Sequence, residues 1–126
     1  MTKKFVDYLK EAEQRVPRVS FEEGMKKFNE GNSVFIDVRD SSEIKSSGTI
    51  KGALKIPRGF IEFAADDNTP YFNKNLSKDK EIFLVCGAGG QAALSGYTLK
   101  EMGYEKVFNL GGIGDWIKSG GPSEND

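Results

Sequence analysis

The fold of this chain is decided by the stretch Glu81-Ile82-Phe83-Leu84-Val85-Cys86-Gly87-Ala88-Gly89-Gly90-Gln91-Ala92-Ala93-Leu94. The apolar run before Cys86 is typical of a buried strand, and the residues after the glycines have a helical spacing that ends at Gly103. A strand, a turn and a helix in that order place the turn at the carboxyl edge of a sheet. Open α/β sheets bind their ligands at that edge.

Cys86 is the only cysteine and stands at the start of this turn. The small residues that follow allow backbone N–H groups to converge on one point, and the helix N-terminus adds a positive partial charge there. Both effects favour a thiolate, so we predict a nucleophilic cysteine. The alternative is structural, because unpaired cysteines are often small buried hydrophobic residues.

Composition limits the possible functions. A chain of 126 residues is one domain, which we place at residues 1–126. Its net charge of -1 offers no field for a polyanion, so we expect no nucleic-acid partner. The amino end is interrupted by charges and lacks the continuous apolar core typical of a signal peptide, and no apolar run is long enough to span a bilayer. With a single cysteine, a reducing compartment is favoured, so we expect a cytoplasmic protein without a membrane partner.

The chain contains no histidine. This absence excludes a Ser-His-Asp triad, a Cys-His pair and any zinc site built on imidazole. Cys86 must therefore be activated by its loop and by neighbouring charges, and we expect no metal and no organic cofactor. It also has no second cysteine to resolve a covalent adduct, so whatever it binds must leave to an outside acceptor.

Apolar spacing and capping signals divide the chain into alternating elements. An amino-terminal helix is predicted at about 3–14, and a second helix begins at a capping box of Ser20 and Glu23 and stops at Gly31. The other predicted strands and helices are strands at 33–38, 53–56, 82–85 and 107–110, short helices near 42–45, 60–64 and 116, and a helix at 91–102. Strands that alternate with helices predict a parallel sheet covered on both faces, with a core at about 20–122.

Two further residues have predicted packing roles. Gly96 lies inside the helix at 91–102, where glycine costs about 1 kcal/mol relative to alanine. It shares one face with Ala92 and Leu99, so we expect it to allow a close approach to the sheet. Trp116 is predicted to anchor the last helix in the core.

Three separated segments carry a resemblance. The first contains Ile36-Asp37-Val38-Arg39 with Gly48 to Ala53, the second is Cys86 to Gln91, and the third contains Met102-Gly103-Tyr104 with Asn109 to Gly112. In this order and spacing they are similar to the signatures of the rhodanese family of single-domain sulfurtransferases. The resemblance implies one α/β domain with a parallel five-stranded sheet and helices on both faces.

The resemblance also implies an activity. Cys86 would take sulfane sulfur from a small donor, thiosulfate or a persulfide, and pass it as a persulfide to cyanide or a thiol. The loop residues that would direct their N–H groups at this sulfur are Gly87, Ala88, Gly89, Gly90, Gln91 and Ala92. A loop of six residues from Cys86 to Gln91 resembles the sulfur-sized loop of the family, whereas the related phosphatases and arsenate reductases have one residue more.

The chain departs from the family at two positions. Thr49 replaces a frequent histidine, and we expect it to be structural. Gln91 replaces a frequent arginine and removes a positive charge beside the sulfur, so a binding or regulatory module without catalysis is the alternative function. Arg58, after Pro57, is a second candidate for an anionic donor, or else a solvated surface residue.

Asp37 and Arg39 alternate at the end of the strand at 33–38. Both match family positions, and a charge pair at a strand end can hold the adjacent turn. We therefore predict a structural role for this pair.

Overall fold

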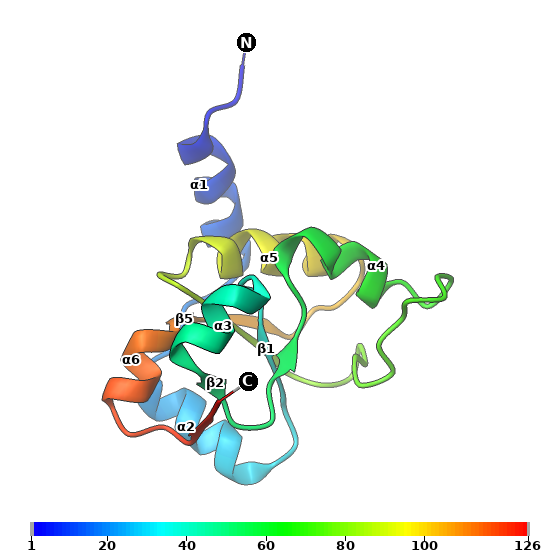
Figure 1. The fold of residues 1–126 in the computed structure, drawn as a ribbon. Helices are drawn as coiled ribbons and strands as arrows, with labels where there is room; N and C mark the ends of the chain where they lie inside the picture. Colours follow the sequence, from blue (N-terminus) through cyan, green and yellow to red (C-terminus); the bar gives the residue numbers. More distant parts are fainter. Residues whose placement is uncertain (1, 126) are drawn as a thin grey trace.

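The structure is a computed structural model that describes residues 2–125, so Met1 and Asp126, the two ends of the predicted domain, lie outside it. Its elements alternate along the chain as the sequence predicts (Figure 1). In order they are α1 (Phe5–Arg15), α2 (Phe21–Glu30), β1 (Val34–Asp37), α3 (Ser41–Ser47), β2 (Thr49–Ile50), β3 (Leu54–Lys55), the 3-10 helix η1 (Arg58–Phe60), α4 (Ile61–Ala65), β4 (Ile82–Cys86), α5 (Gly90–Glu101), β5 (Val107–Gly112), α6 (Ile113–Lys118) and β6 (Ser123–Glu124).

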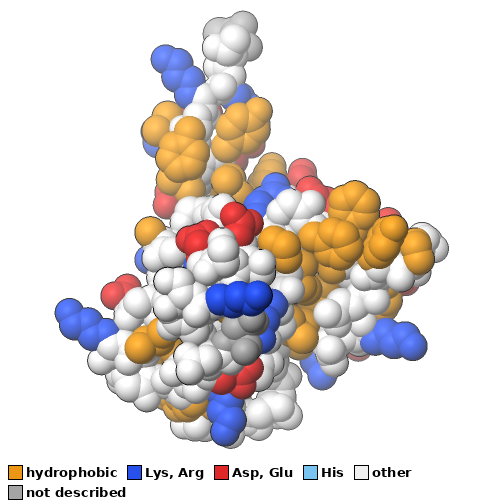
Figure 2. Space-filling view, viewed as in Figure 1, with side chains coloured by type: hydrophobic (Ala, Val, Ile, Leu, Met, Phe, Trp, Pro, Cys, Tyr) orange, Lys and Arg blue, Asp and Glu red, His pale blue; other side chains and the backbone are white. Residues whose placement is uncertain are grey.

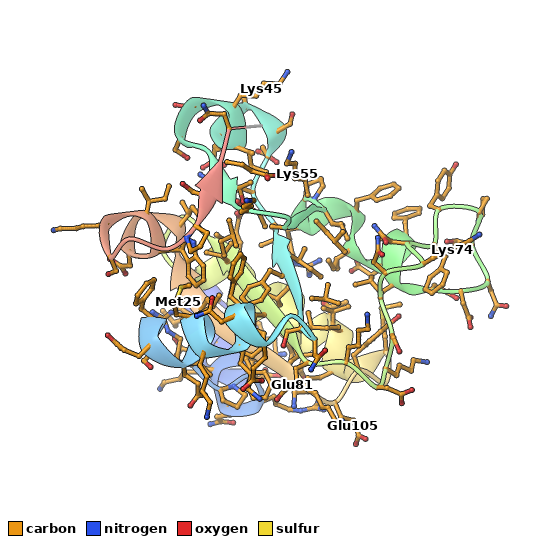
Figure 3. All side chains as sticks on the ribbon, turned by 90° about the horizontal axis from the view of Figure 1, so that it is seen from below. Met25, Lys45, Lys55, Lys74, Glu81 and Glu105 are labelled. Carbon is orange, nitrogen blue, oxygen red and sulfur yellow. The ribbon has the colours of Figure 1, made fainter. Side chains whose placement is uncertain are left out.

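The main sheet is parallel and has the strand order β3-β1-β4-β5. All four strands therefore end at one edge. In Figure 3, Glu81 and Glu105, which precede β4 and β5, lie at one end of the sheet, and Lys55, which ends β3, lies at the other. The α/β class and the parallel sheet with helices on both faces are confirmed.

The strand number differs from the expected five, because the main sheet has four strands among the described residues. β2 pairs instead with β6 in a separate antiparallel ribbon, through Thr49 with Glu124 and Ile50 with Ser123. On the free side of β5 the chain forms only one parallel bridge within residues 2–125, between Arg18 and Asn109. Pro17 has no backbone N–H to extend that bridge into a strand.

Alternating side chains of the strands feed two cores, one on each face of the sheet. Ile82, Leu84 and Cys86 pack on the face covered by α1, α4 and α5. Phe83 and Val85 pack on the opposite face, below which α2 and α6 lie (Figure 1). Burial on both faces explains the unbroken apolar run before Cys86.

On the second face, the Ser20 cap, the Gly31 stop and the core position of Trp116 are confirmed, whereas of the predicted capping box only the bond accepted by Ser20 is present. Ser20 Oγ accepts a hydrogen bond from the Glu23 backbone N–H at 3.1 Å, and Gly31 ends α2 in the left-handed conformation, with φ of 76°. Trp116 is buried, its indole N–H donates to the Pro122 carbonyl at 2.8 Å, and its ring meets Phe21 edge-on. It therefore anchors α6 as predicted.

Gly96 lies where α5 meets the end of α1. A methyl carbon built there would lie 2.8 Å from Val16 Cγ1 and 3.2 Å from Leu84 Cδ1, so the close approach involves α1 as well as the sheet. Overpacking costs about 1–3 kcal/mol and the helix propensity of alanine returns about 1 kcal/mol. We expect Gly96→Ala to lower the free energy of unfolding by about 1 kcal/mol in urea denaturation.

Gly114 in α6 provides the matched control, because a methyl carbon there would meet nothing within 4 Å. We expect Gly114→Ala to raise the free energy of unfolding by about 0.5 kcal/mol through helix propensity alone. Equal changes in the two variants would show that the contact between Gly96 and Val16 does not matter.

Some large apolar side chains stay on the surface. Two groups of them lie on α1, which projects from the domain, and on the segment from the end of η1 through α4 to the loop after it (Figures 1 and 2). These exposed residues are Phe5, Val6 and Tyr8 in the first group and Phe60, Phe63 and Tyr71 in the second. None of the helices within residues 2–125 is long and apolar enough to cross a bilayer.

Candidate active site

Cys86 is the last residue of β4, at the carboxyl edge of the sheet. The residue is 2% exposed, and its Sγ accepts hydrogen bonds from the backbone N–H groups of Gly89 at 3.0 Å and Ala92 at 3.4 Å. The convergence of N–H groups that the sequence predicts is therefore present for these two residues. Cys86 is buried, as the structural alternative requires, but its sulfur has polar contacts that a purely apolar residue would not need.

The sulfur also completes the first turn of α5. Ala92 is the third residue of this helix, and its N–H has no partner within the helix. Gly89, the residue before the helix, has no side chain to act as a cap and adopts φ of 103°, which residues with a side chain rarely do. Cys86 Sγ thus takes the place of the usual capping oxygen at the positive end of the helix dipole.

A β-bulge in β5 supports the loop from below. Leu84 pairs with Asn109 and Val85 with Gly111, so Leu110 is an extra residue on β5. The buried Asn109 side chain accepts from the Gly111 N–H at 2.7 Å and donates to the Gly89 carbonyl at 2.9 Å. It thereby ties the bulge to the loop that surrounds Cys86 Sγ.

Sequence reasoning assigned no role to Asn109, although the segment from Asn109 to Gly112 carries part of the family resemblance, and it missed Arg18 altogether. The Arg18 guanidinium lies against Gly89 and Gly111. These are the two glycines to which the Asn109 side chain is hydrogen-bonded. The signal for Asn109 was the polar residue inside an otherwise apolar strand. Arg18 has no comparable local signal.

The other predicted loop residues lie on the outer side of the turn. Gly87, Ala88 and Gln91 are exposed, and Gly90 is half-buried at the first position of α5. The N–H groups that donate to Cys86 Sγ are those of Gly89 and Ala92. Gly87, Ala88 and Gln91 are therefore the loop residues most exposed to solvent.

The guanidinium of Arg58, the predicted second cation, contacts two other side chains. Arg58 lies in η1, where Nη1 faces the Glu62 carboxylate at 3.4 Å and Nη2 donates to Thr98 Oγ1 at 3.3 Å. Its positive charge is therefore paired, and it is half-buried instead of fully solvated. These partners of the Arg58 guanidinium lie outside the loop from Cys86 to Ala92.

Asp37 and Arg39 form a buried ion pair, as predicted, with Arg39 Nη2 at 2.8 Å from Asp37 Oδ2. Arg39 also donates to Ser47 Oγ at 2.7 Å and to the Gly48 carbonyl at 2.8 Å, and Thr49 Oγ1 donates to Asp37 Oδ2 at 2.7 Å. The pair joins the end of β1 to the end of α3 and to β2. The structural role expected for Thr49 is confirmed.

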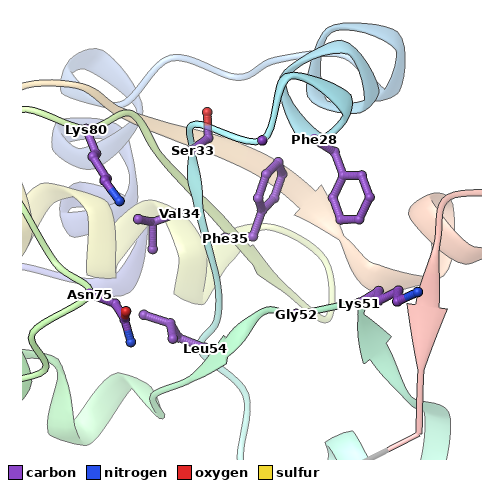
Figure 4. Close-up of a pocket in the computed structure, with 10 residues that line it drawn as sticks. Phe28, Ser33, Val34, Phe35, Lys51, Gly52, Leu54, Asn75 and Lys80 are labelled. Atoms are coloured by element: carbon purple, nitrogen blue, oxygen red, sulfur yellow. The ribbon is translucent and has the colours of Figure 1, made fainter.

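A well-formed cavity of about 380 Å³ lies away from Cys86 (Figure 4). Its lining includes Val34, the first residue of β1, which pairs with Ile82, the first residue of β4. Cys86 lies four residues farther along β4, or about 13 Å at 3.3 Å per residue. The cavity therefore belongs to the amino edge of the sheet and not to the cysteine loop.

No cluster of three or more metal-ligating side chains occurs in the part of the chain that the structure describes. The site brings together one sulfur, two directed N–H groups and the helix N-terminus. The model of the rhodanese-like domain matches residues 20–119 of the sequence. The chain belongs to the rhodanese-like domain family.

Among curated relatives, this rhodanese-like chain is 29% identical over 103 residues to the putative sulfur carrier protein YrkF of Bacillus subtilis. The match covers 80% of this chain and 51% of that protein, so the chain spans about half the length of this relative. The relative's name refers to sulfur carriage.

Two solved structures cover nearly the whole rhodanese-like chain. A protein of unknown function from Rhodopseudomonas palustris, described as a possible tyrosine phosphatase, has 31% identity and a TM-score of 0.90, and covers 98% of this chain and 96% of its own. The polysulfide-sulfur transferase homodimer of Wolinella succinogenes has 28% identity and a TM-score of 0.77, with 97% and 88% covered. The names of the sulfur carrier and of this transferase support a general role in sulfur transfer for proteins similar to this chain.

Proposed function

We propose that this protein moves sulfane sulfur from a small donor to a thiophilic acceptor through a persulfide on Cys86. One observation carries the proposal: Cys86 Sγ lies at the end of β4 and accepts N–H hydrogen bonds from Gly89 and Ala92. These donors stabilise negative charge on sulfur in the absence of any histidine.

With thiosulfate as the donor, the Cys86 thiolate attacks the outer sulfur. A new S–S bond forms to Cys86, the bond between the two thiosulfate sulfurs breaks, and sulfite leaves with that electron pair. The negative charge now lies on the terminal sulfur of the Cys86 persulfide. We expect the backbone N–H groups of the more exposed loop residues, Gly87, Ala88, Gly90 and Gln91, to stabilise this charge.

In the second half, the acceptor removes the terminal sulfur. Cyanide attacks it to give thiocyanate, or a thiolate attacks it to give a new persulfide, and the Cys86 thiolate is the leaving group in both cases. The acceptor must come from outside, because the chain has no second cysteine. Stabilisation of the leaving thiolate by Gly89 and Ala92 assists this step.

Two other functions compete with sulfur transfer. The likeness to the Rhodopseudomonas protein suggests a phosphatase, but a loop of six residues from Cys86 to Gln91 is one residue short of the phosphatase pattern. A binding module without catalysis is suggested by the neutral Gln91. Against it, a binding surface does not require a thiol held by two N–H groups.

Mass spectrometry of the intact protein tests the proposal. After incubation with thiosulfate or a persulfide donor, we expect a mass gain of one sulfur atom, and cyanide or a small thiol should remove it. Protein kept in buffer alone is the control. If neither donor adds sulfur under conditions in which iodoacetamide still labels Cys86, a binding module is favoured instead.

A further inference from the structure

The Arg18 guanidinium lies next to the loop from Cys86 to Ala92, although Arg18 belongs to a different segment of the chain. Residues 17–19 run beside β5, where the Asn109 N–H donates to the Pro17 carbonyl at 2.8 Å and the Val19 N–H donates to the Asn109 carbonyl at 3.0 Å. These two bonds fix the backbone of Arg18 beside the bulge of β5.

The Arg18 side chain covers the backbone of the loop. A methyl group on Gly89 would overlap Arg18 Nη1, and one on Gly111 would lie 2.9 Å from Nη2. The N–H of Gly89 in turn donates to Cys86 Sγ at 3.0 Å. A single glycine therefore separates the guanidinium from the backbone donor that holds the sulfur.

The charge of Arg18 is not neutralised by an ion pair within residues 2–125, whereas Arg39 and Arg58 are paired with Asp37 and Glu62. The carboxylate that shares a surface with Arg18 is Asp115, and both line a cavity of about 250 Å³. Asp115 is exposed and forms no ion pair with Arg18. Arg18 is exposed to solvent, so the field of its guanidinium at the neighbouring loop is strongest at low salt.

We propose that Arg18 supplies the positive charge that attracts anionic sulfur donors to Cys86, in place of an arginine at position 91. This extends the proposed function, on which it rests, by naming the class of donor, an anion such as thiosulfate or a polysulfide. Because attraction through space does not need direct contact, an arginine outside the loop can serve while Gln91 stays neutral.

Alkylation of Cys86 tests the charge without sulfur transfer. Iodoacetate is an anion and iodoacetamide is neutral, so the ratio of their rates reports the potential at the sulfur. We expect Arg18→Gln to lower the ratio of iodoacetate to iodoacetamide rates by about fivefold at low salt, and Arg18→Lys to lower it by less than about twofold. The effect of Arg18→Gln should shrink as the salt concentration rises.

Arg15→Gln is the matched control, since it removes the same charge three residues away, where the guanidinium lies 5.3 Å from the centre of the Tyr97 ring. The ratio of iodoacetate to iodoacetamide rates in Arg15→Gln should differ from the wild-type ratio by less than about twofold. Asp115→Asn removes the neighbouring negative charge and should raise the ratio. The proposal is overturned if the ratio of iodoacetate to iodoacetamide rates is the same in Arg18→Gln as in the wild-type protein. If that ratio is the same because both rates fall equally, Arg18 only supports the shape of the loop.

Kinetics with thiosulfate complete the test. We expect Arg18→Gln to lower kcat/KM by about fivefold to tenfold, and the added Gln91→Arg substitution to restore most of it. If the wild-type protein loads sulfur but Arg18→Gln leaves the ratio of the two alkylation rates unchanged, this inference fails and the proposed function stands. If the ratio falls in Arg18→Gln but no donor loads sulfur, Arg18 sets the charge at the loop and the proposed function fails.

Discussion

The Cys86→Ser variant is expected to take up no sulfur at all from thiosulfate or a persulfide donor. A hydroxyl forms no persulfide, and the chain has no other cysteine to replace it. The loss should be complete in intact-mass measurements under conditions that fully load the wild-type protein. A mass gain that persists in Cys86→Ser would place the sulfur elsewhere and contradict the mechanism.

The fold of this variant should survive, which separates chemistry from stability. Serine keeps an oxygen that can accept from the Ala92 N–H, whereas Cys86→Ala leaves that N–H without its partner. We expect Cys86→Ala to be less stable than Cys86→Ser by about 1 kcal/mol in urea denaturation, although both are inactive.

The largest effect on stability is expected for Arg39→Met. The substitution removes the guanidinium from the fully buried Asp37 carboxylate, which keeps hydrogen bonds from the Thr49 hydroxyl and from the backbone N–H of residue 39. Removal of one partner from a buried pair costs about 3–5 kcal/mol, a large part of the about 5–15 kcal/mol that stabilises a domain. Urea denaturation measures this change in the free energy of unfolding.

The control is Arg58→Met, which breaks a more exposed pair with Glu62 and should cost less than about 1 kcal/mol. The double variant Asp37→Asn with Arg39→Met should lose less free energy of unfolding than the two single variants lose in sum. The reason is that the double variant has no buried carboxylate at position 37 to be left unpaired. Equal costs for Arg39→Met and Arg58→Met would mean that burial adds nothing to the Asp37 pair.

The strands of the main sheet and the helices beside them could be predicted, because their apolar runs are buried on both faces and their ends carry local signals such as Ser20 and Gly31. The ribbon of β2 and β6 could not. Each strand has two residues, and the pairing joins Thr49 to Glu124 across most of the chain. Local sequence contains no signal for such a contact, and the count of five strands came from resemblance alone.

The residues of the candidate site also divide into those that local sequence predicts and those that only the tertiary fold brings to the loop. Cys86 and its donors Gly89 and Ala92 follow from a strand, a turn and a helix that are continuous in sequence. Arg18 reaches the loop only because the segment after α1 lies beside β5, which is a property of the tertiary fold. Arg58 could be suspected from its position, but Glu62 and Thr98 decide where its guanidinium lies.

The sulfur of Cys86 is both the reacting atom and the acceptor that completes the first turn of α5. The protein's conformational stability is therefore thermodynamically linked to the occupancy of this one atom. A persulfide alters the acceptor at the start of α5, and alkylation alters it in a different way. Each covalent state of Cys86 thus has its own melting temperature, and thermal unfolding can follow the loading of sulfur without any assay of the product.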